Sequence, residues 1–265
     1  MRSPVALRIV VVAGFLFLYA PILSLVIYSF NESRLVTVWS GFSLKWYGEL
    51  LSDPQIIGAA WISLKVAFLS ASIATVLGTL AALVLVRGGR GRAVLGGLVT
   101  APLVMPEVII GLSLLLLFVA MEGLIGWPGG RGLLTIVIAH ATFGAAFATV
   151  VIEARMVTLD RAVEDAAQDL GAGPLRVFFD VTLPALAPAL VSAWLLAFTL
   201  SLDDVVIASF VAGPGSSTLP MVIFSKVRLG VSPEVNALAT LVIVLVSCLV
   251  LIAAWVSARQ RVPEA

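Results

Sequence analysis

The chain has 265 residues, of which 61% are hydrophobic and 12% are charged. Soluble domains average about 45–50% apolar and about 25% charged residues, so this composition is typical of a membrane protein. The formal net charge of +1 excludes the strongly basic surface of a nucleic-acid-binding protein, and the single Cys248 excludes an internal disulfide.

Neither a metal site nor a nucleotide site is expected. His140 is the only histidine, and zinc-type centres usually gather three or four His and Cys ligands. A phosphate-binding P-loop needs a Gly-Lys pair followed by Ser or Thr, whereas Lys45 and Lys65 follow leucine and Lys226 follows serine. We therefore predict no cofactor, no metal and no ATPase site in this chain.

Six apolar stretches are long enough to cross a membrane, which takes roughly 20 helical residues. The first follows Arg2 and Arg8, but it is longer than the apolar core of a secretory signal and no small-residue cleavage site follows it. We interpret it as a retained anchor. The sequence predicts an all-α, polytopic membrane protein, organised as one transmembrane domain over residues 1–265. The six transmembrane helices are expected at residues 9–28, 66–86, 94–120, 133–152, 186–202 and 237–256.

The basic residues predict the orientation of these spans, because cytoplasmic loops are enriched in lysine and arginine. The short turn from Arg87 to Arg92 reads RGGRGR and lies directly between the second and third spans. If it is cytoplasmic, both chain termini are cytoplasmic as well. The outer segments then cover residues 31–58, 122–132 and 203–234. Aromatic residues in or beside them are expected at the membrane interface: Trp39, Trp46, Tyr47, Trp61 and Trp127.

The longest cytoplasmic segment covers residues 153–185 and is also the most charged. In LDRAVEDAAQDL, residues 159–170, apolar positions recur on one face at helical spacing, which predicts a short amphipathic helix. Gly171, Gly173 and Pro174 should end this helix. A second short helix is expected to begin at Leu175 and to be broken by Pro184 before the fifth span.

This segment resembles the EAA loop of the permease subunits of bacterial ABC importers. The motif spacing is complete from Asp165-Ala166-Ala167 through Gly171 to Val181-Thr182-Leu183-Pro184, with aspartate for the usual glutamate and valine for the common isoleucine. The resemblance implies the type I ABC importer permease fold and a coupling helix that docks on a separate ATPase subunit. The docking residues that it implies are Glu164, Asp165, Ala166, Ala167, Gly171, Leu183 and Pro184.

An amphipathic helix lying on lipid headgroups is the alternative for this segment, but such a helix would carry a basic polar face. Here the polar face is acidic. Longer segments, including APLVMPEVIIGLSLLLLF at residues 101–118, resemble the polyamine branch of these importers, especially the second permease subunit of putrescine and spermidine importers. The resemblance implies a place in the bacterial inner membrane, in contact with lipid, and three kinds of protein partner: a dimer of ABC ATPase subunits, a second permease subunit forming a heterodimer, and a periplasmic substrate-binding protein.

Three acidic residues are candidates for the substrate pathway. Glu107 lies within the third apolar run, where an uncompensated carboxylate costs about 2.5–3.5 kcal/mol on insertion scales. Asp203 and Asp204 are adjacent at the end of the fifth span and repel each other unless a cation or solvent compensates them. The ammonium groups of a polyamine would do so. Alternatively, Glu107 is a polar contact inside the bundle and the aspartates are a solvated helix end, while His140 is interpreted as a hydrogen-bonded packing residue.

The sequence thus predicts a non-enzymatic permease subunit of an ATP-driven importer for a small substrate, namely a polyamine such as putrescine or spermidine. The alternative is a proton-coupled secondary transporter of a small cation, which explains the buried acid but not the EAA spacing. An intramembrane hydrolase is disfavoured, because adjacent Asp203 and Asp204 cannot face each other across two helices.

Overall fold

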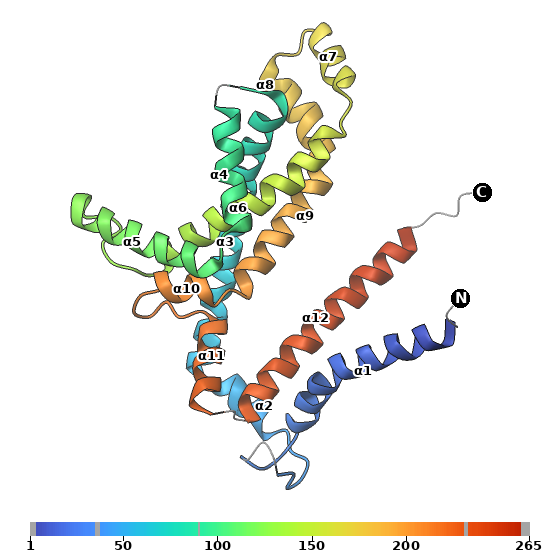
Figure 1. Cartoon of the computed structure of the whole chain (residues 1–265), viewed down its shortest axis with the longest axis vertical. Helices are drawn as coiled ribbons and strands as arrows, with labels where there is room; N and C mark the ends of the chain where they lie inside the picture. The colour runs from blue at the N-terminus through green and yellow to red at the C-terminus, as the bar shows by residue number, and fades with distance from the viewer. Residues whose placement is uncertain (1–3, 35–37, 90, 231–232, 261–265) are drawn as a thin grey trace. The chain divides into compact units, whose positions relative to one another are not determined.

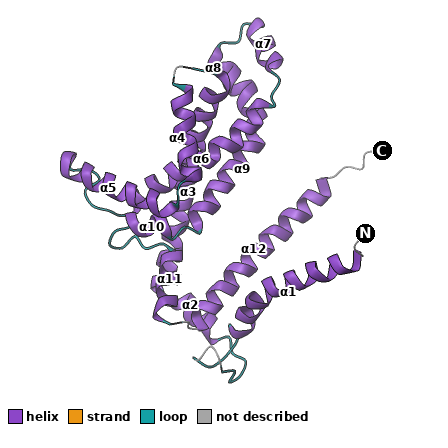
Figure 2. Ribbon diagram, in the orientation of Figure 1, coloured by secondary structure: helices purple, strands orange, loops and turns teal. Residues whose placement is uncertain are grey.

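The computed structural model describes residues 4–34, 38–89, 91–230 and 233–260, and their regular secondary structure is helical (Figures 1 and 2). An isolated bridge between Asn31 and Phe42 is the exception to this pattern in the described ranges. The predicted all-α class is therefore confirmed. The chain divides into two compact units, one formed by Met1–Ile57 with Ile223–Ala265 and the other by Gly58–Val222.

Among the described residues, five helical runs are long and apolar enough to span a membrane: Val5–Tyr28, Pro54–Arg87, Glu107–Ile125, Leu133–Val157 and Pro174–Leu202. They correspond to α1 (Pro4–Tyr28), α3 (Pro54–Arg87), α5 (Glu107–Ile125), α6 (Leu133–Val157) and a run that ends with α9 (Leu183–Leu202). The remaining elements are α2 (Lys45–Ser52), α4 (Arg92–Val104), α7 (Arg161–Asp169), α8 (Pro174–Val177), the π-helical η1 (Phe178–Thr182), α10 (Val206–Val211), α11 (Leu219–Leu229) and α12 (Pro233–Gln260).

Two parts of the predicted topology stay predictions. Helix α12 covers the sixth predicted span, but the apolar helix established for the described side chains runs only from Pro233 to Val244. The orientation of the termini depends partly on Arg2, Arg90 and Arg261, which lie outside the described residues.

The third predicted span, residues 94–120, is wrong as one continuous helix. It is divided into α4 and α5 at Met105 and Pro106, which have extended ψ angles of 140° and 135°. Proline lacks an N–H for the helical ladder and disfavours the helical conformation in the residue before it. Pro102, by contrast, lies inside α4 and does not break the helix. As a result, Glu107 becomes the first residue of a helix rather than a residue in the middle of one.

Small residues bring α3, α6 and α9 into close contact within the Gly58–Val222 unit. A Cβ atom on Gly78 of α3 would lie 2.8 Å from the Cβ of Ala148 on α6, and one on Gly144 would lie 3.2 Å from the Cβ of Ala74. Side chains this small allow helix backbones to approach closely in membrane proteins. Figure 1 shows α7 and α8 at one end of this bundle and α5 and α10 toward the other.

In the other unit, α12 packs against α1 and α2. Trp46 of α2 is buried, and its Nε1–H donates to the Asn31 carbonyl at 2.6 Å. The expectation of an interfacial position is therefore wrong for Trp46, which belongs to the interior of this unit. By contrast, Trp39 and Trp61 are exposed, as interfacial residues would be.

A cluster of three charged side chains also lies in this unit. The Lys226 ammonium group lies 2.9 Å from Asp53 Oδ2 and 3.4 Å from Glu234 Oε2. The hydrogen bond from Lys226 holds the pKa of Asp53 below its usual value, with further help from the Gln55 backbone amide. Burial works to lower the pKa of Lys226, but its contacts with Asp53 and Glu234 outweigh burial and raise it. The cluster fastens the beginning of α3 to α11 and α12.

Candidate functional site

The segment between the fourth and fifth predicted spans forms the expected amphipathic helix, α7. At its beginning, Asp160 Oδ1 accepts a hydrogen bond of 2.9 Å from the Ala162 amide. At its end, Gly171 has a φ of +87°, its amide bonds the Gln168 carbonyl at 2.8 Å, and the Ala172 amide bonds the Ala167 carbonyl at 3.0 Å. This pair of bonds is a Schellman motif, which requires a left-handed residue. The predicted helix and its glycine terminator are both confirmed.

The second short helix differs from the prediction at its end. Helix α8 continues through the π turn η1 directly into α9, so Pro184 does not interrupt the helix as predicted. In η1 the Leu183 amide bonds the Phe178 carbonyl, five residues back. Pro184, in the first turn of α9, has no amide to offer the ladder, and a π turn is a common place for such a disruption. The chain therefore enters the fifth span as one continuous helical run.

The tip of the segment presents apolar side chains to the outside. Leu170 is 90% exposed and Leu175 is 76% exposed, and Val163 and Phe179 are also exposed. Of the predicted docking residues, Asp165, Ala166, Gly171 and Pro184 are exposed, while Ala167 and Leu183 are half-buried. Uncovered apolar side chains of this size usually mark an interaction surface.

Glu164 differs from the other predicted docking residues because its side chain turns back toward the bundle. Its Oε1 lies 2.7 Å from Arg87 Nη2 and accepts a hydrogen bond of 2.5 Å from the Thr182 hydroxyl. Arg87 Nη2 also donates to Thr182 Oγ1 at 3.3 Å. The structure thus connects the last residue of α3, the first turn of α7 and the last residue of η1.

The three predicted pathway acids come together at the other end of the bundle. Glu107 begins α5, where the free amides and the helix dipole favour a negative charge. Asp203 follows the last residue of α9, and Asp204 follows it. Helices α5 and α10 pack closely, since a Cβ on Gly111 would lie 2.6 Å from Phe210 Cδ2. The Glu107 carboxylate is within electrostatic range of both aspartates.

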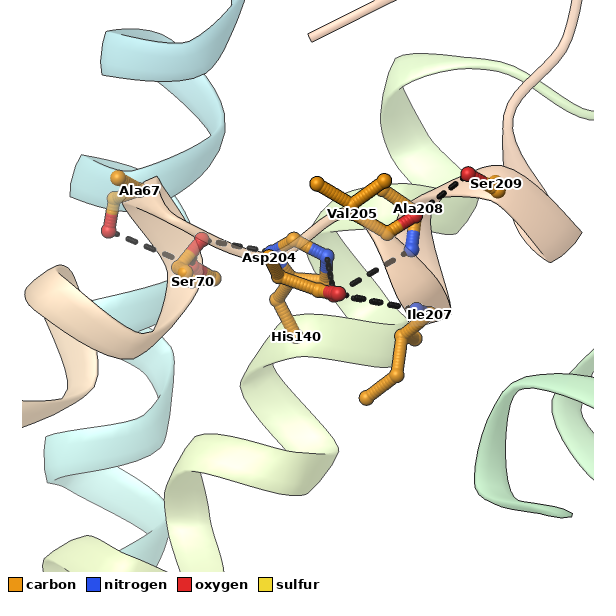
Figure 3. Close-up of polar contacts among 9 residues, drawn as sticks. Ala67, Ser70, His140, Asp204, Val205, Ile207, Ala208 and Ser209 are labelled. Carbon is orange, nitrogen blue, oxygen red and sulfur yellow. Dashed lines mark hydrogen bonds and ion pairs between the residues drawn. The ribbon is translucent and has the colours of Figure 1, made fainter. Parts of the chain in front are cut away.

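The three carboxylates differ in how the protein surrounds them. Glu107 and Asp203 are exposed, whereas only 9% of the Asp204 side chain is. Asp204 accepts hydrogen bonds from the Ile207 amide at 2.9 and 3.1 Å and from the Ala208 amide at 3.4 Å, and so stabilises the first turn of α10. Figure 3 shows the Asp204 carboxylate between these amides and the His140 ring. Asp204 is therefore held by the fold, while Glu107 and Asp203 remain open to a ligand.

His140 is buried, as expected of a packing residue, and its two ring nitrogens face two different polar groups. Nδ1 lies 2.7 Å from Ser201 Oγ, which is 3.0 Å from Ser70 Oγ of α3. Nε2 lies 3.4 Å from Asp204 Oδ2, close enough for electrostatic attraction but not aligned as a hydrogen bond. A carboxylate only accepts, so a proton on Nε2 suits the side of the ring that faces Asp204, and in that tautomer the Ser201 hydroxyl donates to Nδ1. A chain of polar groups thus runs from Ser70 of α3 through Ser201 of α9 to His140 of α6, which faces Asp204.

Sequence reasoning missed the partners in these clusters. Ser70 and Ser201 are single hydroxyls in apolar runs, and such residues commonly bond to their own helix backbone, so the sequence carried no signal for them. Arg87 was read only as an orientation cue, and Thr182 only as part of the motif. The charge of Glu164 suggests a basic partner, but the sequence does not indicate which of several arginines that partner is.

The sequence was then compared with known proteins. Residues 74–262 match the family described as "Binding-protein-dependent transport system inner membrane component". The chain belongs to this family. Membership confirms a transport-system permease subunit, without the ATPase of such systems, and gives no support to the secondary-transporter alternative.

Two relatives in this family are similar over almost the whole chain. The putrescine transport system permease protein PotI of Escherichia coli (strain K12) is 59% identical over 263 residues, covering 98% of this chain and 93% of the relative. The spermidine/putrescine transport system permease protein PotC of the same strain is 39% identical over 250 residues, covering 94% and 92%.

Solved structures share the fold at low sequence identity. A chain of a bacterial ABC transporter that imports the acidic polysaccharide alginate has a TM-score of 0.73 at 18% identity, covering 97% of this chain and 95% of that one. A chain of the MetNI methionine ABC transporter, in inward-facing conformations, has a TM-score of 0.61 at 16% identity, covering 82% and 98%. The fold is thus that of ABC transporter membrane chains, as the resemblance implied.

Proposed function

We propose that this chain is a permease subunit of an ATP-driven importer that carries a polyamine, putrescine first of all, across the inner membrane of a bacterium. The observation that carries the proposal is the 59% identity to a putrescine permease over 98% of the chain. The second relative, at 39% identity over 94% of the chain, is a spermidine/putrescine permease, which is consistent with a polyamine substrate.

The acidic cluster supports a cationic substrate. Glu107 and Asp203 offer two exposed carboxylates, and the less exposed Asp204 adds a third negative charge within electrostatic range of Glu107. Ammonium groups form strong charge-assisted hydrogen bonds with carboxylates. Among the described residues no group of acids is arranged to hold a metal ion, so the carboxylates suit a cation with several separated charges better than a single compact ion. A polyamine has this form.

The coupling loop, residues 153–185, is the proposed contact with the ATPase. Its exposed apolar side chains around α7 fit a helix-in-groove contact, in which an apolar helix face enters a groove of the partner. The proposal places this loop and both termini in the cytoplasm. It also includes the other partners: ATPase subunits acting as a dimer, a second permease subunit in a heterodimer, a periplasmic substrate-binding protein, and the surrounding lipid.

Reconstitution of the whole transporter tests the substrate class. Proteoliposomes would contain this chain with its sibling permease and ATPase subunits, and the binding protein would be added outside. We expect ATP-dependent uptake of putrescine. The uptake of spermidine and of the anion glutamate would be measured under the same conditions for comparison. Uptake of glutamate but not of either polyamine would refute the substrate, and polyamine transport by this chain alone under a proton gradient would refute the mechanism.

Neutralising one carboxylate tests the pathway within the same system. A hydrogen bond to a charged group contributes about 1.5–3 kcal/mol, so Glu107→Gln should lower putrescine transport roughly 10- to 100-fold while leaving complex assembly intact. Glu122→Gln is the matched control, because Glu122 is an exposed glutamate near the opposite end of the same helix. Equal uptake by both variants would remove Glu107 from the pathway.

A further inference from the structure

Within the proposed docking loop, one charged side chain is engaged inside the chain itself. Only 20% of the Glu164 side chain is exposed, against 40% for its partner Arg87. The third member, Thr182, is 1% exposed. The carboxylate receives two donors on one oxygen, from Arg87 at 2.7 Å and from Thr182 at 2.5 Å. A carboxylate held this way is not free to reach an ATPase subunit unless both contacts break.

The three residues belong to three elements that meet at one end of the bundle. Arg87 is the last residue of α3, where its positive charge also suits the negative end of the helix dipole. Glu164 lies in the first turn of α7. Thr182 ends η1 and directly precedes α9. The cluster therefore ties the docking helix to two of the helices that form the bundle.

A second contact makes the same connection to α3. Arg161 Nη2, in the first turn of α7, donates to the carbonyl of Val86 at 3.1 Å. Both contacts thus join the first turn of α7 to the final two residues of α3. Together with the Thr182 bond, these contacts fix both the position and the direction of α7. The backbone after α7 would not fix its direction alone, because it passes through Gly171 and Gly173, and glycine has the least restricted backbone of any residue.

We propose that Glu164 is a positioning residue that transmits the movement of α7 to α3 and α9, and not a contact to the ATPase. The proposal rests on the proposed function in one respect, namely that α7 is the docking helix. A force applied to α7 through its exposed apolar face reaches α3 through Arg87 and α9 through Thr182. Without these bonds α7 can still dock, but it turns on its flexible connections and the bundle does not follow.

Single neutral substitutions in the complete transporter separate positioning from docking. Glu164→Gln and Thr182→Val remove the charge and the hydroxyl with little change in size. Asp169→Asn is the matched control, because Asp169 is an exposed acid of α7 outside the predicted docking residues. We expect Glu164→Gln and Thr182→Val to keep the ATPase subunits bound and ATP hydrolysis active, while substrate carried per ATP hydrolysed falls about tenfold. Thr182→Ser, which keeps the hydroxyl, should restore coupling.

Exchange of the two charges tests the pairing itself. The double variant Arg87→Glu with Glu164→Arg should recover most of the coupling that either single variant loses, because the ion pair is rebuilt in reverse. Failure of the exchange to recover any coupling, or normal coupling in Glu164→Gln, would overturn the proposal. Loss of the ATPase subunits in Glu164→Gln but not in Arg87→Gln would also overturn it, since Glu164 would then be a docking contact. Should Glu164→Gln not fold, the Thr182→Val and Thr182→Ser pair decides the matter.

A readout that needs no substrate keeps this proposal distinct from the proposed function. Amide hydrogen exchange of the assembled complex, with and without ATP, should show a nucleotide-dependent change at the last turn of α3 in the wild-type chain. In Glu164→Gln that change should disappear while the change in α7 remains. An unaltered response in α3 refutes the positioning role even if polyamine transport is established, and a lost response supports it even if the substrate proves to be another compound.

Discussion

Gly171 offers the sharpest test of the coupling loop, because only its backbone conformation constrains it. Its φ of +87° lies in the left-handed region, and a Cβ atom built on it would meet nothing within 4 Å. A substitution there introduces no steric clash with the rest of the chain. Within this chain, Gly171→Val can therefore act only through backbone strain and through the loss of the Schellman bonds that end α7.

The magnitude follows from the same geometry. An L-residue in the left-handed conformation costs about 1–2 kcal/mol, and valine is among the worst because it is branched at Cβ. If the helix end relaxes, the bonds from Gly171 to Gln168 and from Ala172 to Ala167 are lost instead. Either way, the docking form of α7 becomes less populated. A penalty of 1–2 kcal/mol corresponds to a roughly 5- to 30-fold weaker docking equilibrium.

Asparagine is the matched control, because it has a similar size but tolerates the left-handed region. We expect Gly171→Val to reduce uptake per ATP hydrolysed by about 5- to 30-fold and Gly171→Asn to stay within about threefold of wild type. The measurement is paired uptake and ATPase activity of the reconstituted complex, with retention of the ATPase subunits on a tagged permease as the check on assembly.

The difference in uptake per ATP between the valine and asparagine variants decides whether the backbone argument is correct. Equal loss in the valine and asparagine variants would mean that any side chain at this position obstructs the partner, and the backbone argument would be wrong. Equal function in both would mean that the end of α7 is not important for docking. Only a difference between residues of similar size supports a conformational role for Gly171.

Two further predictions concern the polar clusters at other places in the chain. His140→Ala should lower polyamine transport severalfold and raise KM more than it lowers kcat. The substitution removes the side chain that faces Asp204 at 3.4 Å and so leaves the Asp204 carboxylate less firmly held. An unchanged KM would assign His140 to packing alone. Asp53→Asn keeps a cap acceptor for α3 but loses the charge partner of Lys226. A lowered Asp53 pKa stabilises the fold above about pH 4, and a raised Lys226 pKa does so below about pH 10. The loss in thermal stability should therefore appear at pH 7 and vanish at acidic pH, once Asp53 is protonated in the folded protein.

The sequence predicted the helical elements where the pattern was strong and local. The apolar runs predicted the C-terminal ends of α1, α3 and α9 to within one residue and that of α6 to within five residues. A lipid-facing helix is apolar on all sides and ends where polar residues begin. The glycine end of α7 was likewise predictable, since Gly171 and the preceding helix formers specify a left-handed terminator. These features depend on residues near one another in the chain.

Prolines were harder to interpret, because their effect depends on what surrounds them. Pro106 divides the third apolar run, Pro102 lies in α4, and Pro184 sits in the first turn of α9 after a π turn. A missing amide breaks a helix in one place and is accommodated in another. Contacts between residues far apart in the sequence could not be predicted for a similar reason. The contact of Glu164 with Arg87 depends on how α3 and α7 lie in space, and no spacing rule connects them.

Helix α9 joins the two proposed functional regions of its unit, and this arrangement limits how they could communicate. Its N-terminal end adjoins Thr182 in the coupling cluster, and its C-terminal end leads into Asp203 in the acidic cluster. At about 1.5 Å per residue, its 20 residues span roughly 30 Å. Asp204 is held by α10 and by the His140 side of α6, whereas Asp203 is exposed and held mainly by its place at the end of α9. We expect a displacement of α9 along its axis to move Asp203 relative to Asp204, because Asp204 is anchored to α10. Such a movement would change the spacing of the carboxylates that the proposed polyamine meets, without altering their charges.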